Sequence, residues 1–126
     1  MKFKKINKTK PTKAKAWKAF SLYIRDRDKK CVTCGSTKWL QGGHFVVGRH
    51  LSILFDERNC HAQCRFCNVI KKGNMVIYYK FMLKKYGQRV IDELLDLDKK
   101  IVQLKSSDYQ ELERYYKEKL AVKEKK

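Results

Sequence analysis

The chain has 126 residues, which suits one small domain with extensions, and its 31 Lys and Arg residues against 13 Asp and Glu give a formal charge of +18 at pH 7. This charge predicts a polyanionic partner, and DNA is the first candidate. Because no apolar run approaches the roughly 20 residues of a membrane-spanning helix, and the N-terminal residues lack the apolar stretch of a secretion signal, we expect a cytoplasmic protein with no membrane partner.

The first 28 residues divide into two predicted segments. Residues 1–12 carry five lysines and few apolar side chains, and Pro11 closes the stretch, which predicts a flexible basic arm. Over residues 13–28, apolar side chains recur every three or four positions, which predicts an amphipathic helix. Its apolar stripe is expected to face the core and consists of Trp17, Phe20, Tyr23 and Ile24.

A hairpin is expected in the next segment. A Cys-x-x-Cys turn, Cys31 to Cys34, is followed by Gly35, which frees the backbone to fold around a metal. The sequence then predicts a strand over 39–41 that continues over 45–47, a loop over 48–52 and a return strand over 53–55.

Helices are expected after a second Cys-x-x-Cys turn, Cys64 to Cys67. A short helix is predicted over 68–72, stopped by Gly73 and Asn74. Longer helices are predicted over 75–86 and 89–97. Ser107 and Gln110 form a capping box that predicts a final helix to about residue 122 and a frayed basic tail over 123–126. The apolar side chains of this helix are expected to complete the core, and pairing of two chains is the alternative.

The two Cys-x-x-Cys turns predict one structural zinc site. Each turn offers two thiolates, and two such turns close the tetrahedral shell of Zn²⁺ without water. A chain without a secretion signal keeps its thiols reduced, so metal binding is favoured over disulfides. The predicted ligands are Cys31, Cys34, Cys64 and Cys67, and Cys60 is expected to be a small buried hydrophobe.

Three further side chains stand at informative positions between and after the cysteines. His44, Asn59 and Asn68, with the four-residue gap from Asn59 to Cys64, resemble the HNH, or ββα-metal, nuclease family in its His-Asn-Asn variant. A narrower resemblance covers about residues 14–95. Gly-His44-Phe, Leu-Phe-Asp-Glu-Arg-Asn59, His61-x-Gln-Cys64-x-x-Cys67-Asn68 and Gly73-Asn74 resemble the phage NinG (Rap) recombination proteins, and the zinc site resembles that of endonuclease VII of T-even phages.

The resemblance implies a fold and an activity. It implies an α+β protein with a zinc-stabilised ββα-metal core and flanking helices over residues 13–100, and a C-terminal helix over 101–126. It also implies an endonuclease that acts on branched recombination intermediates such as Holliday junctions. A nickase, homing or packaging endonuclease on duplex DNA is the first alternative, and a non-catalytic zinc-stabilised DNA-binding module is the second.

The chemistry of phosphodiester hydrolysis assigns roles to these side chains. Imidazole titrates near neutral pH, so His44 suits the general base, and Gly42 and Gly43 would let a phosphate backbone approach it. Asn68 can offer its amide oxygen to a catalytic cation, Mg²⁺ or another divalent ion. The resemblance implies that Asn59 pins the loop and orients His44.

One position departs from the family pattern. Many HNH nucleases carry Asp or His directly before the base as a second cation ligand, whereas this chain has Gly43. Asp56, His50, His61 or water are open candidates for the missing ligand, and His61 is alternatively a DNA contact.

Basic side chains around these positions predict DNA contacts. They are Arg49, Arg58, Arg65, Lys71 and Lys72. Contacts to phosphate position a protein without reading sequence, which favours a structure-selective enzyme. A Holliday junction has two symmetric strands to cut, so a homodimer is a further hypothesis.

Overall fold

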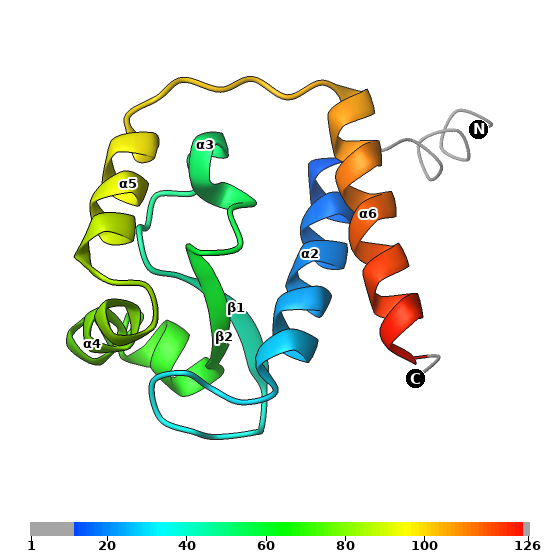
Figure 1. Cartoon of the computed structure of the whole chain (residues 1–126). Helices are drawn as coiled ribbons and strands as arrows, with labels where there is room; N and C mark the ends of the chain where they lie inside the picture. Colours follow the sequence, from blue (N-terminus) through cyan, green and yellow to red (C-terminus); the bar gives the residue numbers. More distant parts are fainter. Residues whose placement is uncertain (1–11, 125–126) are drawn as a thin grey trace. The chain divides into compact units, whose positions relative to one another are not determined.

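The computed structural model describes residues 12–124, so all but the last residue of the predicted basic arm lies outside the described residues. The described residues form helices and one small antiparallel sheet of two strands (Figure 1), which confirms a mixed helical and sheet fold. The elements in chain order are α2 (Lys13–Asp28), β1 (Leu40–His44), α3 (Leu51–Leu54), β2 (Cys60–Cys64), η1 (Phe66–Ile70), α4 (Met75–Lys85), α5 (Gln88–Asp98) and α6 (Ser106–Glu124). No helix among these described residues is long and apolar enough to cross a membrane.

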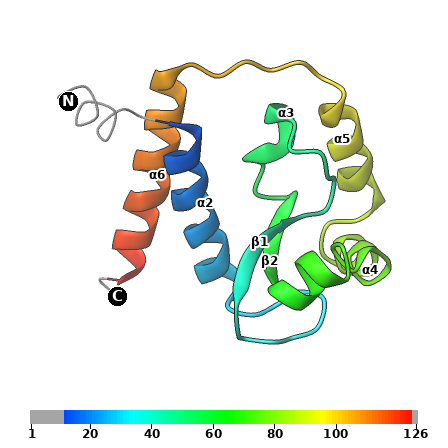
Figure 2. The same ribbon diagram turned by 180° about the vertical axis from the view of Figure 1, so that it is seen from behind.

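The chain forms two compact units. One is Ile24–Gln103, and the other combines Met1–Tyr23 with Leu104–Lys126. In the second unit, the start of α2 lies beside α6 in both ribbon views (Figure 2). Tyr116 of α6 is buried there, with ring centroids 5.0 Å from Phe20 and 5.1 Å from Tyr23. The predicted apolar stripe of α2 and the core role of the final helix are thereby confirmed, whereas the domain boundaries at 13–100 and 101–126 stay a prediction.

The sheet of the larger unit brings His44 opposite Cys60 and Leu40 opposite Cys64. The predicted return strand over 53–55 is wrong: Leu51–Leu54 is one helical turn, α3, and the partner strand is β2. All five residues of β2 are buried. Because this buried strand contains His61 and Gln63, it lacks the apolar alternation by which a half-buried strand is recognised.

Two helices close the core of the larger unit. α4 and α5 confirm the predicted helices to within one residue at each end, and Gly87 between them has φ +91°, a conformation that favours glycine. Their buried side chains pack with residues that follow β1 and lie in α3. This cluster consists of Val46, Ile53, Tyr78, Met82, Ile91 and Leu94.

The ends of two other helices differ from expectation. η1 is a short π-helix over Phe66–Ile70, so Asn68 lies at its middle rather than at a helix start. The positive φ angles of Gly73 (+96°) and Asn74 (+49°) follow it, as the predicted stop requires. α6 begins one residue before Ser107, and its first turn is closed by Asp108, whose carboxylate accepts a hydrogen bond from the Lys105 N–H at 2.8 Å.

Candidate metal centre and active site

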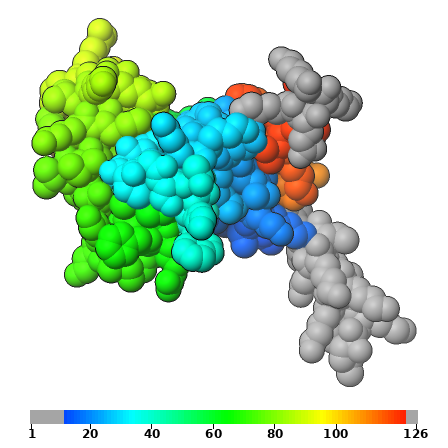
Figure 3. All heavy atoms as spheres, turned by 90° about the horizontal axis from the view of Figure 1, so that it is seen from below, coloured from blue at the N-terminus to red at the C-terminus, as the bar shows by residue number. Residues whose placement is uncertain are grey.

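Four cysteine side chains converge in the larger unit. Cys31 and Cys34 lie in the loop after α2, Cys64 ends β2 and Cys67 lies in η1. Their sulfur atoms all lie within 4.8 Å of one another, and the Sγ atoms of Cys34 and Cys64 are 3.6 Å apart. Four thiolates at about 2.3 Å from one Zn²⁺ stand roughly 3.8 Å apart, so the cluster can hold a zinc ion. Figure 3 shows the loop after α2 (cyan) directly against the green segment that includes η1.

The ionisation of these thiols favours a bound cation. Burial raises the pKa of Cys31, but hydrogen bonds from Thr33 and from backbone N–H groups outweigh it and lower the pKa to about 6. At Cys34 a backbone hydrogen bond from Ser36 lowers the pKa, whereas burial and the neighbouring cysteines raise it to about 12. An ionised Cys31 therefore disfavours ionisation of Cys34. A divalent cation bound between the thiols would remove this repulsion.

His44 ends β1 with its imidazole held in one tautomer. Its Nε2 lies 3.0 Å from the backbone carbonyl oxygen of Leu54. A carbonyl only accepts, so Nε2 carries the hydrogen and Nδ1 carries the lone pair. Burial lowers the pKa of His44, the Leu54 carbonyl opposes this and the charge of Arg49 adds to it. His44 is therefore neutral at pH 7 and can accept a proton.

Asn59 fixes the segment directly after His44. Its side chain is fully buried, its Oδ1 accepts from the Val46 N–H at 2.7 Å and its Nδ2 donates to the Val46 carbonyl at 3.0 Å. Its backbone carbonyl also accepts from the Phe45 N–H at 2.9 Å. This pair of side-chain bonds matches the loop-pinning role that the resemblance implies for Asn59.

Asn68 and His44 open onto one hollow of about 200 Å³. The Nδ2 of Asn68 donates to Gln41 Oε1 at 2.8 Å, which leaves the amide oxygen turned toward Gly43. Two of the predicted DNA-binding cations, Arg49 and Lys72, line the same hollow. Its complete lining is Gly42, His44, Val47, Gly48, Arg49, Asn68, Lys72, Gly73 and Met75.

Gly43 does not serve the close phosphate approach expected of it. Gly43 is buried, and a Cβ built on it would overlap with the side chain of Gln63 and stand 3.1 Å from Asn68 Oδ1. The missing side chain therefore makes room for two amides of the protein itself.

Two of the side chains considered as the missing cation ligand are engaged elsewhere. His50 Nδ1 lies 2.7 Å from Asp98 Oδ1, and Asp56 Oδ2 lies 2.9 Å from Arg58 Nη2. Arg58 also reaches Glu93 at 2.9 Å, so carboxylates neutralise this predicted DNA contact. None of these described side chains lines the hollow of His44 and Asn68.

His61, the third such side chain, is part of the core. It is fully buried, with Nδ1 3.0 Å from the Tyr78 hydroxyl and Nε2 2.8 Å from the Tyr86 hydroxyl. Burial lowers the pKa of His61 to about 3. His61 therefore has no surface with which to contact DNA. Neighbouring Cys60 is fully buried and its pKa is raised by burial to about 12, which confirms its expected apolar role.

The remaining predicted DNA contacts flank η1. Arg65 and Lys71 are exposed, and Lys71 Nζ stands 5.5 Å from the centre of the Phe66 ring. They lie outside the lining of the hollow but within the same short segment as Asn68.

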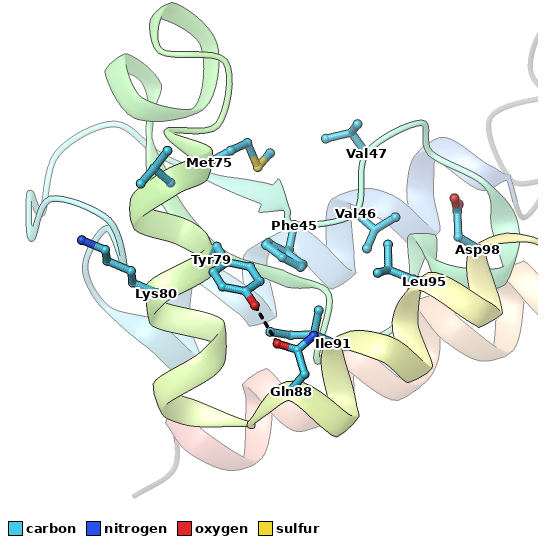
Figure 4. A pocket seen from close by; sticks show the side chains of 11 residues that line it. Phe45, Val46, Val47, Met75, Tyr79, Lys80, Gln88, Ile91, Leu95 and Asp98 are labelled. Atoms are coloured by element: carbon cyan, nitrogen blue, oxygen red, sulfur yellow. Dashed lines mark hydrogen bonds between the residues drawn. The ribbon is translucent and has the colours of Figure 1, made fainter.

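Another hollow, of about 770 Å³, is formed by the segment after His44 together with α4 and α5 (Figure 4), and it shares Val47 and Met75 with the first. Apolar side chains from this segment, α4 and α5 form most of its lining, among them Phe45, Tyr79 and Leu95. The Tyr79 hydroxyl donates to Gln88 Oε1 at 2.6 Å across its floor. It contains none of the predicted site residues.

Sequence reasoning missed one polar side chain that lies against Gly43. Gln63 is fully buried in β2, and its Nε2 donates to the Gly73 carbonyl at 2.8 Å and to Thr33 Oγ1 at 3.2 Å. Its Oε1 has no hydrogen-bond partner among the described residues. The only sequence signal is a glutamine two residues from a strand histidine, which becomes informative once β2 is known to pair with β1.

Comparison with known proteins identifies relatives. The family model described as Bacteriophage Lambda NinG protein matches residues 1–126. Protein ninG of Escherichia phage 933W is 37% identical over 84 residues, which are 63% of this chain and 42% of that protein. Protein ninG of Salmonella phage P22 and that of Escherichia phage lambda are each 36% identical over 84 residues, 63% of this chain and 41% of theirs. The chain thus spans about two fifths of the length of these curated relatives, and no solved structure matches it.

Proposed function

From the membership of this chain in the family described as Bacteriophage Lambda NinG protein, we propose a function. Together with the geometry around His44, this membership supports a metal-dependent DNA endonuclease of the HNH type. Its substrates are branched recombination intermediates such as Holliday junctions. The observation that carries the proposal is the hollow in which a neutral histidine, an amide oxygen and two cations meet. These are His44, Asn68, Arg49 and Lys72.

The chemistry assigns one task to each of these side chains. His44 Nδ1 takes a proton from water as the water oxygen attacks phosphorus and the phosphorus–oxygen bond to the leaving strand breaks. Arg49 and Lys72 draw the phosphate backbone into the hollow. The amide oxygen of Asn68 would hold a divalent cation such as Mg²⁺, which would supply charge compensation for the crowded phosphate.

The backbone around the hollow supports the HNH assignment. β1, β2 and η1 follow one another as two strands and a helix, with His44 at the end of the first strand and Asn68 in the helix. Asn59 ties the segment between the strands to its own side chain. We also propose that Zn²⁺ at the four cysteines is structural, because all four protein ligands together complete its shell.

Cleavage of a four-way DNA junction in Mg²⁺ tests the function. His44→Ala should lower the single-turnover cleavage rate by about 10²- to 10⁴-fold, the usual contribution of a general base, while junction binding stays unchanged. His50→Ala is the matched control, because His50 lies outside the hollow and pairs with Asp98. Cleavage by His44→Ala at the wild-type rate would exclude His44 as the base.

The same assay separates the alternatives. A nickase, homing or packaging enzyme would cleave matched linear duplex at least as fast as the junction. A non-catalytic DNA-binding module would bind the junction in wild-type and His44→Ala form and cleave in neither. The absence of an acidic side chain at Gly43 is the observation that favours this second alternative.

A homodimer on the junction is part of the proposal. Two symmetric strands require two equivalent active sites, which a two-fold pair of chains supplies. Sedimentation of the protein with junction DNA should give two chains per junction, and a strict monomer would contradict it.

A further inference from the structure

Two amide oxygens converge at the position where the HNH pattern places an acidic ligand. The point where a Cβ on Gly43 would stand overlaps with Gln63 Oε1 and lies 3.1 Å from Asn68 Oδ1. Gly43 directly precedes His44, the proposed base. Two oxygens on the same side of one glycine are close enough to share a cation.

The orientation of the Gln63 amide is set by its neighbours. Its Nε2 donates to the backbone carbonyl of Gly73 at 2.8 Å, and a carbonyl oxygen can only accept. A reversed amide would face one oxygen with another, so Oε1 must point away from Gly73, toward Gly43. Thr33 Oγ1 accepts a second bond from the same nitrogen at 3.2 Å.

This oxygen is buried and lacks a partner among the described residues. Gln63 is 0% exposed, and Oε1 accepts no hydrogen bond there. A buried acceptor without a partner has lost its hydration without compensation. A hard divalent cation bonds amide oxygens readily, so it would compensate this loss.

We propose that Gln63 supplies the cation ligand that Gly43 lacks, so that Gln63 Oε1 and Asn68 Oδ1 together hold the divalent cation. This inference rests on the proposed nuclease function for its biological meaning. Mg²⁺ commonly keeps several waters and takes only one or two protein oxygens plus substrate phosphate, so two amides suffice. Because both ligands are neutral, cation affinity is low until a phosphate supplies negative charge.

Paramagnetic broadening by Mn²⁺ alone tests the site in the zinc-loaded wild-type protein. Thiolates select zinc over Mn²⁺, so the cysteine cluster does not compete. The side-chain NH₂ signals of Gln63 and Asn68 should broaden first as Mn²⁺ is added, whereas that of Gln88 should persist. If the Gln63 and Asn68 signals survive as long as that of Gln88, the inference is overturned. A hydrogen bond between the side-chain amides of Gln63 and Asn68 would also overturn it, because Gln63 Oε1 would then have a partner.

Two variants give the affinity. Gln63→Met conserves volume and removes the oxygen, and it should weaken Mn²⁺ binding at least about tenfold. Gly43→Asp combined with Gln63→Ala places a carboxylate in the vacated space and should restore or exceed wild-type affinity. Gln88→Met, on α5, is the matched control and should bind as wild type. Zinc content and far-UV circular dichroism confirm that each variant is folded.

Measurements of Mn²⁺ binding and of junction cleavage distinguish failure of the Gln63 ligand role from failure of the nuclease function. Gln63→Met that binds Mn²⁺ within twofold of wild type, while wild type cleaves junctions, overturns the ligand role and leaves the nuclease function intact. Mn²⁺ binding that is lost in Gln63→Met and restored in the double variant, with no cleavage by any form, supports the ligand role and overturns the nuclease function. If Gln63→Met fails to fold, the broadening of wild-type signals alone decides.

Discussion

The proposed role of His44 as general base rests on its surroundings as well as on its identity. The carbonyl of Leu54 fixes the tautomer that places the lone pair on Nδ1, and burial favours the neutral ring. By contrast, His61 is held between two tyrosine hydroxyls and His50 pairs with Asp98. The three histidines therefore have different surroundings, and only those of His44 fit the proposed general base.

The pH profile of cleavage should reflect the lowered pKa of His44. Burial moves this pKa below its usual value of about 6.5, and only the neutral ring acts as a base. The rate should therefore stay constant as pH falls from 8 to about 6.5 and decline only below that. A decline that begins above pH 7 would contradict the assignment.

Asn59→Ala should destabilise the fold by roughly 2–4 kcal/mol, because it leaves the buried N–H and carbonyl of Val46 without their partners. Urea denaturation measures the loss. Gln110→Ala, an exposed amide on α6, should change stability by no more than about 0.5 kcal/mol. Equal effects of the two substitutions would rule out the pinning role of Asn59.

Spacing along the sequence was enough to propose His44, Asn59 and Asn68 as site residues, but not to propose Gln63. The first three carry a pattern of residue types at fixed distances from the cysteines. Gln63 becomes notable only when the pairing of Gln41 with Gln63 and of Gly43 with His61 puts its side chain over Gly43. Such a role arises from strand register, which a buried strand without alternation does not reveal.

Some helices and strands were predictable from the sequence and others were not. α2, α4 and α5 were predictable because their apolar side chains repeat with the period of a helix. α3 and β2 were not, since four apolar-rich residues are too few to distinguish a helical turn from a strand, and β2 is buried on both faces. The convergence of the two Cys-x-x-Cys turns was predictable because ligand type and spacing do not depend on knowing the fold.

The cysteine cluster connects the elements that carry Gln63 and Asn68. Cys64 ends the strand that contains Gln63, and Cys67 directly precedes Asn68. Metal bound there would fix β2 and η1 to the loop after α2.

Cys64→Ser should therefore lose both zinc and the folded state, because the remaining three thiolates cannot complete the shell. Elemental analysis should give one zinc per chain in wild type and in His44→Ala, and none in Cys64→Ser, together with a collapse of its thermal transition. A folded, zinc-free Cys64→Ser protein would show that the cluster is dispensable.

The charge of the whole molecule predicts salt-sensitive binding. The protein has a formal charge of +18. If it neutralises about eight phosphates, the slope of log affinity against log salt concentration should be about −7. Fluorescence anisotropy with junction DNA from 50 to 300 mM salt measures it. A slope close to zero would mean that phosphate contacts do not dominate binding.

The most direct test of the account is cleavage of a four-way junction by the zinc-loaded wild-type chain, measured with and without added Mg²⁺. We expect phosphodiester cleavage that requires Mg²⁺, prefers the junction over matched linear duplex and disappears in His44→Ala. Tight junction binding with no cleavage at any Mg²⁺ concentration would contradict the nuclease assignment and leave a zinc-stabilised DNA-binding module.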